Sequence, residues 1–205
     1  HTGEKTKYGN MYIMNKIILG ISGSLRKESV TLKLMKAFSA LAPQNIEFRV
    51  ADLSKLPIYN QDLELPEPDF LIEFKEQIKS ADGVIFLTPE YNRSIPPVLK
   101  NALDWASRPQ ARVGRGTWGG KPAGVVGVTP YTLGAFGAVH HLRQVLSFLN
   151  MPTMQQPEFY LSHAEEKFDE NGKLTDEVTI KFINNFWTEF DIFSERFKGP
   201  SNIEN

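Results

Sequence analysis

Serine and arginine side chains cluster in one short stretch near the start of the chain. Ser22, Ser24 and Ser29 surround Arg26, between an apolar run at 16–21 and a helical pattern that follows. Hydroxyl groups, a guanidinium and the free N–H groups of a helix start all favour a bound anion. A helix cap explains one serine, but not three with an arginine. The stretch predicts a phosphate-binding loop, and it matches neither the Walker A nor the GxGxxG pattern.

Prolines bracket a second stretch of unusual composition, TPEYNRSIPP at 88–97. Proline fixes the backbone, so neighbouring N–H groups are presented at set positions. Tyr91 offers an aromatic face, and Asn92 favours a local turn and offers a polar edge. This combination suits a planar heterocycle with donors and acceptors on its rim. A rigid turn with an incidental tyrosine is the alternative interpretation.

Composition excludes several kinds of chemistry. The chain has 205 residues and no cysteine, which excludes disulfide scaffolds, thiolate nucleophiles, iron–sulfur clusters and zinc sites that use cysteine. A hydrophobic fraction of 41% with 23% charged residues is typical of a globular protein. The net charge of −1 gives no indication of a nucleic-acid partner, and no stretch is long and apolar enough for a transmembrane helix. We expect a cytoplasmic protein that binds neither nucleic acid nor membrane.

The small net charge hides an uneven distribution. Residues 84–157 carry seven basic and two acidic groups, whereas residues 158–205 carry five basic and eleven acidic groups. A basic middle segment attracts small anions such as a phosphorylated cofactor. Solvated loop and helix charges are the simpler alternative.

The elements that must position these stretches alternate between strands and helices. Apolar runs predict strands, and apolar residues at helical spacing predict helices. The predicted strands are 16–21, 46–51, 83–88 and 121–129, with a weak one around 153–160. The predicted helices cover about 30–41, 70–78, 98–106, 139–149 and 174–197.

This alternation predicts an α/β fold: a three-layer sandwich with a five-stranded parallel sheet and helices on both faces. In such sheets the ligand lies beyond the carboxyl ends of the strands. The unusual segments 22–29, 89–97 and 129–137 follow strands one, three and four, as this rule requires. We expect one domain at 16–197, preceded by an extension at 1–15 and followed by a tail at 198–205.

Two motifs resemble a known family. GSLRKES at 23–29 and PEYNRSIPPVLKNALDW at 89–105 are similar to the FMN-binding signatures of the NAD(P)H-dependent FMN reductases. That family includes flavodoxin-like quinone, chromate and azo-dye reductases. The resemblance covers about residues 16–160 with the right order and spacing. It implies a flavodoxin-like fold, bound FMN, and NADPH or NADH as co-substrate.

The resemblance assigns a first group of residues to the FMN phosphate. These are Ser22, Ser24, Arg26, Ser29 and, at the position where the family commonly has asparagine, Thr31.

A second group of residues is assigned to the isoalloxazine ring, largely through backbone groups. These are Pro89, Glu90, Tyr91 and Asn92, with Thr129 and Tyr131 from the bulkier loop after strand four. Backbone N–H groups near Asn92 are expected to bond the N5/O4 edge of the flavin, and Tyr91 to pack near the ring.

The function implied is transfer of a hydride from NAD(P)H through flavin N5 to a small-molecule acceptor: a quinone, free flavin, azo compound or metal ion. No side chain is required as a catalytic acid or base, because the cofactor carries the chemistry. Ping-pong kinetics and a homodimer or homotetramer are expected. A flavodoxin-like electron carrier and a low-turnover flavin-binding regulatory protein are the alternatives, and the net charge of −1 argues against the acidic carrier.

Other conspicuous residues favour structural roles. His140 and His141 are adjacent on a predicted helix, so they point to different faces and do not predict a metal site. The stripe Phe182, Phe186, Phe190, Phe193 and Phe197 predicts a helix packed on the sheet. Trp118, in the loop at 108–120, is compatible with the rim of the site or with a subunit contact.

Overall fold

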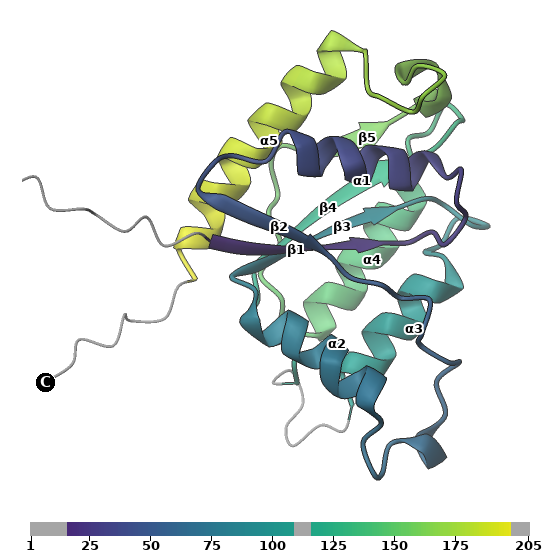
Figure 1. The fold of residues 1–205 in the computed structure, drawn as a ribbon, viewed down its shortest axis with the longest axis vertical. Coiled ribbons are helices and arrows are strands. Elements are labelled where there is room, and N and C mark those ends of the chain that lie inside the picture. The colour runs from purple at the N-terminus through teal and green to yellow at the C-terminus, as the bar shows by residue number, and fades with distance from the viewer. Residues whose placement is uncertain (1–15, 109–115, 198–205) are drawn as a thin grey trace, which may run out of the picture.

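The protein is an α/β sandwich built on one parallel sheet (Figure 1). The computed structural model describes residues 16–108 and 116–197, so the extension at 1–15, the tail at 198–205 and most of the loop at 108–120 lie outside the described residues. The strand order is β2-β1-β3-β4-β5, and every pair is parallel. This order is that of flavodoxin-like sheets, as the sequence predicts.

Three central strands are short apolar runs with both faces covered. β1 (Lys16–Ser22), β3 (Gly83–Thr88) and β4 (Ala123–Val128) are buried along almost their whole length. A parallel strand covered on both faces needs such continuous apolar sequence. β2 (Ile46–Val50) is an edge strand with exposed residues, and its sequence alternates accordingly.

The fifth strand differs from the prediction. β5 covers only Phe159–Leu161, not 153–160. Pro152 and Pro157 have no N–H to donate to a ladder, and Thr153 makes only an isolated bridge to Ala123. The pairing with β4 therefore begins after the second proline.

Among the described residues, two α-helices cover one face of the sheet and three cover the other (Figure 1). α1 (Val30–Ala40) and α5 (Glu177–Glu195) lie on the first face, where Phe186 and Phe190 are fully buried. α2 (Asp69–Ser80), α3 (Pro97–Ala106) and α4 (Phe136–Phe148) lie on the second. The phenylalanine stripe is confirmed as core at these two positions, whereas Phe182 and Phe197 are partly exposed.

Local chemistry sets the helix ends. The Asp176 carboxylate caps α5 by accepting the N–H of Thr179 at 2.9 Å, which starts the helix three residues later than predicted. Proline at the first position begins α3 without losing a bond. Trp118 is 1% exposed and donates its indole N–H to the Leu103 carbonyl, so it belongs to the core and not to a rim. None of the helices in the described part of the chain is long and apolar enough to cross a membrane.

Candidate active site

Three loops meet at the carboxyl edge of the sheet. They follow β1, β3 and β4, which are neighbours in the strand order. In the first loop Gly23 donates its N–H to the Leu87 carbonyl at 2.8 Å. A Cβ atom at Gly23 would lie 3.0 Å from Pro89 Cδ, so a side chain at this position would force the second loop to shift. The loop after β1 is thereby held directly against the loop after β3.

The serines of the first loop organise its backbone. Ser29 caps α1, because its hydroxyl accepts the N–H of Thr31 at 3.1 Å. The Ser22 hydroxyl accepts the N–H of Ser24 at 3.2 Å and donates to the carbonyl of the same residue. The three serines are buried. The capping role considered from sequence is therefore real for Ser29, and Ser22 shapes the turn that precedes it.

Thr31 carries an unsatisfied hydroxyl beside this turn. The residue is fully buried in the first turn of α1, and its Oγ1 atom has no hydrogen-bond partner within the described residues. A buried polar atom without a partner costs about 1–3 kcal/mol, so such atoms point to a ligand or ordered water that completes them. Phosphate oxygens at a helix start fit this need.

Backbone donors and a cation complete the first loop. The N–H groups of Lys27, Glu28 and Val30 have no hydrogen-bond acceptor in the part of the chain that the structure describes. The Arg26 side chain is exposed, and among the same residues it has no hydrogen-bond or ion-pair partner. Free N–H groups at a helix start and an unpaired guanidinium are the donors that a phosphate needs. This loop fits the phosphate group of FMN.

The second loop forms a tight two-residue turn. Tyr91 and Ser94 exchange two backbone hydrogen bonds, of 2.9 and 3.0 Å. Asn92 and Arg93 between them have positive φ values of 51° and 67°, which is the signature of a type I′ turn. Asn92 suits this conformation, as expected, whereas arginine is unusual in it.

Glu90 ties this turn to α4. Its Oε2 atom accepts the N–H of Ala138 at 3.1 Å, and its Oε1 atom accepts a bond from Arg93 at 3.0 Å. The Glu90 side chain is only 12% exposed, whereas that of Arg93 is 71% exposed. The carboxylate sits at the positive end of the helix, where the helix dipole stabilises it.

The third loop folds back over β4. Gly134 has a φ of 59°, and a Cβ atom there would lie 2.6 Å from the Cβ of Tyr160. A Cβ atom at Gly127 would lie 2.3 Å from the Gly134 carbonyl oxygen. Both positions therefore require glycine, and they bring Thr129 and Tyr131 to the edge of the site.

A cavity of about 320 Å³ lies between the second and third loops. Four of the predicted ring-binding residues line it: Glu90, Asn92, Thr129 and Tyr131. Pro89 and Tyr91 do not line it. Three further residues do, and they were not assigned from sequence: Arg93, Leu133 and Ala135. Arg93 lies within the second motif, at 89–105, and this position is the sequence feature that could have assigned it to the site.

The two adjacent histidines contact different parts of the structure. His141 Nδ1 lies 2.7 Å from the Ser94 hydroxyl, whereas the His140 ring lies 4.2 Å from that of Phe136. They face different neighbours, and no group of metal-binding side chains occurs among residues 16–108 and 116–197.

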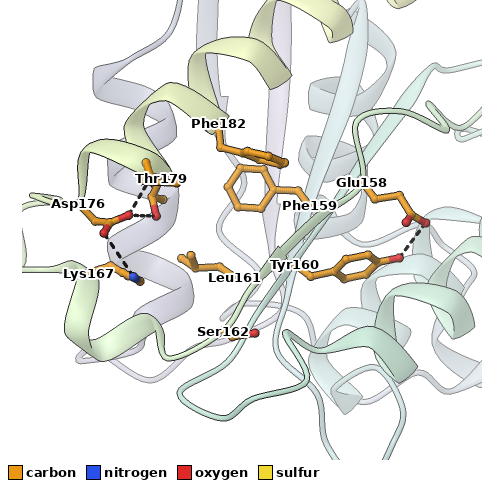
Figure 2. A pocket seen from close by; sticks show the side chains of 10 residues that line it. Glu158, Phe159, Tyr160, Leu161, Ser162, Lys167, Asp176, Thr179 and Phe182 are labelled. Atoms are coloured by element: carbon orange, nitrogen blue, oxygen red, sulfur yellow. Dashed lines mark hydrogen bonds and ion pairs between the residues drawn. The ribbon is translucent and has the colours of Figure 1, made fainter.

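A larger cavity, of about 440 Å³, lies elsewhere, beside β5 and the start of α5 (Figure 2). Its polar groups are already paired: Lys167 with Asp176, and Tyr160 with Glu158. Burial, followed by the hydrogen bond to Glu158, raises the pKa of Tyr160 to about 12, so its hydroxyl stays protonated at neutral pH. None of the predicted site residues lines this cavity.

Comparison with known proteins identifies the family of this chain. The sequence model of one family, described as NADPH-dependent FMN reductase, matches residues 17–166. The chain belongs to that family. The resemblance noted from the two motifs is therefore confirmed.

Its relatives have related activities. The chain is 46% identical over 171 residues to a quinone reductase of Pseudomonas putida, covering 83% of this chain and 90% of that one. It is 43% identical over 170 residues to a 2-hydroxy-1,4-benzoquinone reductase of a Burkholderia species, covering 83% and 91%.

A solved structure gives the same result for the fold. FerB of Paracoccus denitrificans, a flavoenzyme NAD(P)H:(acceptor) oxidoreductase, superimposes with a TM-score of 0.81 at 39% identity, covering 89% of this chain and 98% of FerB. The flavodoxin-like fold, the oxidoreductase class, FMN as the flavin and NAD(P)H as the co-substrate are thus confirmed.

Proposed function

We propose that this protein is a cytoplasmic reductase that uses NAD(P)H and bound FMN to reduce small-molecule acceptors, quinones first among them. The observation that carries the proposal is the buried, unpartnered Thr31 hydroxyl at the start of α1. It lies on the carboxyl edge of the sheet that also carries the lined cavity. A phosphate site and a ring-sized cavity at the same sheet edge suit one phosphorylated flavin.

Two groups of residues bind FMN, one at its phosphate and one at its ring. Ser22, Ser24, Arg26, Ser29 and Thr31 bind the phosphate through hydroxyls, the guanidinium and backbone N–H groups. The second and third loops hold the ring, with Glu90, Asn92, Thr129 and Tyr131 along the cavity. Pro89 and Tyr91 belong to the second loop but do not line the cavity.

When bound, FMN would supply the two-electron redox chemistry that links oxidation of NAD(P)H to reduction of the acceptor. The protein contributes orientation and electrostatics rather than an acid or base. Glu90 does not suit proton transfer, because both of its oxygens are engaged by Ala138 and Arg93. A quinone acceptor agrees with the activities of the relatives at 43% and 46% identity.

We further propose that the protein is a homodimer or homotetramer. Three side chains beside the cavity are exposed although they are large and apolar or aromatic: Tyr131 at 77%, Leu133 at 55% and Phe136 at 54%. Neighbouring exposed apolar side chains of this kind mark contact surfaces. A second subunit seated there would shape the open side of the cavity.

The direct test is the visible spectrum of the purified protein followed by steady-state kinetics. The spectrum should show flavin absorption that is released by denaturation. The FMN-loaded protein should oxidise NADPH with menadione as acceptor, with parallel double-reciprocal lines that indicate a ping-pong mechanism. No turnover by the FMN-loaded protein would exclude the reductase assignment and leave the electron carrier or regulatory protein. Light scattering on the same sample gives the oligomeric state.

A further inference from the structure

Arg93 occupies an unusual place at the edge of the ring cavity. It is one of two charged residues that line the cavity, the other being Glu90. Its side chain is 71% exposed, whereas that of Glu90 is 12% exposed. The positive charge therefore faces solvent at the cavity mouth, and the negative charge lies behind it.

Glu90 neutralises the charge of Arg93 at the cavity mouth only in part. Glu90 uses Oε2 for the Ala138 N–H at the start of α4 and Oε1 for a single guanidinium nitrogen, Nη1 of Arg93. The other guanidinium nitrogens, Nε and Nη2, have no hydrogen-bond acceptor within the described residues. His141 also contacts this turn, since its Nδ1 atom lies 2.7 Å from the Ser94 hydroxyl.

The backbone conformation at position 93 does not favour arginine. Position 93 has a φ of 67°, in the second central place of a type I′ turn, where glycine is the favoured residue after asparagine. A non-glycine residue in the left-handed region is strained, and such strain concentrates at functional sites.

We propose that Arg93 makes this site selective for acceptors that carry a negative charge close to the reducible ring, such as quinones with an ionised hydroxyl or a carboxylate substituent. The inference rests on the proposed function, since it takes the lined cavity as the place where the acceptor stacks. The free guanidinium nitrogens bind the oxygen anion of the acceptor, and a planar fork of donors suits a carboxylate or enolate oxygen.

We expect the Arg93 guanidinium to bind the acceptor rather than the nicotinamide cofactor. Arg93 lines the same cavity as the ring-binding residues Asn92 and Thr129, so it faces groups attached directly to the reacting ring. The phosphates of a nicotinamide dinucleotide lie many bonds away from its reacting ring.

The test compares two ligands of the same shape that cannot be reduced by the flavin. These are 2-naphthoate, which is an anion, and 2-naphthamide, which is neutral. Their dissociation constants for the FMN-loaded protein are measured by calorimetry. The variants are R93Q, R93K and R93G, with R49Q as matched control. Arg49 is likewise an exposed arginine, paired with Glu47, but it lies on β2 and does not line the cavity.

The wild type should bind naphthoate more tightly than naphthamide. The preference should fall about fivefold in R93Q and R93G, as expected for loss of one partly exposed ion pair, and should be largely kept in R93K and R49Q. It should also weaken as salt rises from 50 to 500 mM in the wild type. R93G relieves the backbone strain, so its Tm should stay close to that of the wild type and exclude misfolding as the cause.

Two results would overturn the inference. One is a naphthoate preference that is the same in R93Q and in the wild type. The other is an R93Q variant whose KM for NADPH rises while the ligand preference stays, which would assign Arg93 to the nicotinamide cofactor. Turnover of menadione by the wild type is measured in parallel. Absence of menadione turnover would contradict the proposed function. The preference for naphthoate would still test the role of Arg93 independently.

Discussion

The Glu90 carboxylate joins the loop after β3 to the first turn of α4, because its Oε2 atom accepts the Ala138 N–H at 3.1 Å. This bond connects residues 48 positions apart in the chain. A Cβ atom at Gly137 would lie 3.0 Å from the same oxygen, so the carboxylate packs closely against the start of α4. The geometry of the second loop therefore depends on the position of α4.

Replacing Glu90 with alanine should loosen both elements. The Ala138 N–H and the Arg93 guanidinium each lose an acceptor, and a hydrogen bond to a charged group contributes about 1.5–3 kcal/mol. We expect the free energy of unfolding of the FMN-free protein to fall by about 2 kcal/mol in denaturant titrations. E90Q keeps one acceptor oxygen and should lose about half as much. An E90A protein as stable as the wild type would contradict the role of this link.

Thr31→Val should stabilise the FMN-free protein and weaken its binding of FMN. The hydroxyl is buried and has no partner among residues 16–108 and 116–197, so its removal should stabilise the FMN-free form by about 1 kcal/mol. FMN affinity should fall about tenfold, because a charge-assisted hydrogen bond to the phosphate is lost. Denaturant titration and fluorescence titration with FMN measure the two effects.

Thr179 provides the control for this substitution. It is also a buried threonine at a helix start, but its hydroxyl donates to Asp176 at 2.7 Å. T179V should therefore destabilise the protein by about 1 kcal/mol and leave FMN affinity unchanged. If T31V destabilises the FMN-free protein as T179V does, the Thr31 hydroxyl has a partner within the protein and is not a phosphate ligand.

The sequence predicts the fold well where apolar runs are continuous. β1, β3 and β4 are recognisable because parallel strands covered on both faces need uninterrupted apolar residues. β5 is only three residues long and follows Pro157, so the pattern alone placed it too early. The start of α1 is predicted well, because the Ser29 cap marks it, whereas the predicted start of α5 lies three residues too early despite its Asp176 cap.

The sequence indicates which loops form the candidate site, but not the contacts between them. Asn92 indicates a turn, but only the structure shows that Arg93 shares the left-handed backbone and lines the cavity. The bond from Glu90 to Ala138 joins distant segments, and no local pattern encodes it. The sequence places Trp118 in a loop, at a rim or a subunit contact, whereas its indole N–H donates to the Leu103 carbonyl inside the core.

Arg26→Ala should weaken retention of FMN. The side chain is exposed and has no ion pair in the described residues, so its removal should not affect the Tm of the FMN-free protein. Loss of a guanidinium–phosphate contact should raise the dissociation constant of FMN about tenfold. R26K should restore part of the affinity, because an ammonium keeps the charge but not the fork of donors. Unchanged FMN affinity in R26A would exclude Arg26 from the phosphate site.

Glu64 should make the stability of the protein depend on pH in the acidic range. The carboxylate is 6% exposed and joins the long connection before α2 to the end of α3. Its Oε1 atom accepts bonds from the Tyr59 hydroxyl at 2.6 Å and from Arg108 Nε at 2.8 Å. The bond from Arg108, and then that from Tyr59, lowers the pKa of Glu64 below its ordinary value of 4.5.

A lowered pKa in the folded state means that the unfolded chain binds the proton more readily. The stabilisation by ionised Glu64 is therefore complete above pH 4.5 and is lost as the pH falls through the lower pKa of the folded protein. E64Q should reduce the Tm by about 3 °C at pH 7, and this difference should shrink below pH 4. E76Q, which alters the exposed pair of Glu76 with Lys79, is the control and should change the Tm little at any pH. A Tm difference for E64Q that is the same at pH 7 and pH 3 would mean that packing, not charge, explains the effect.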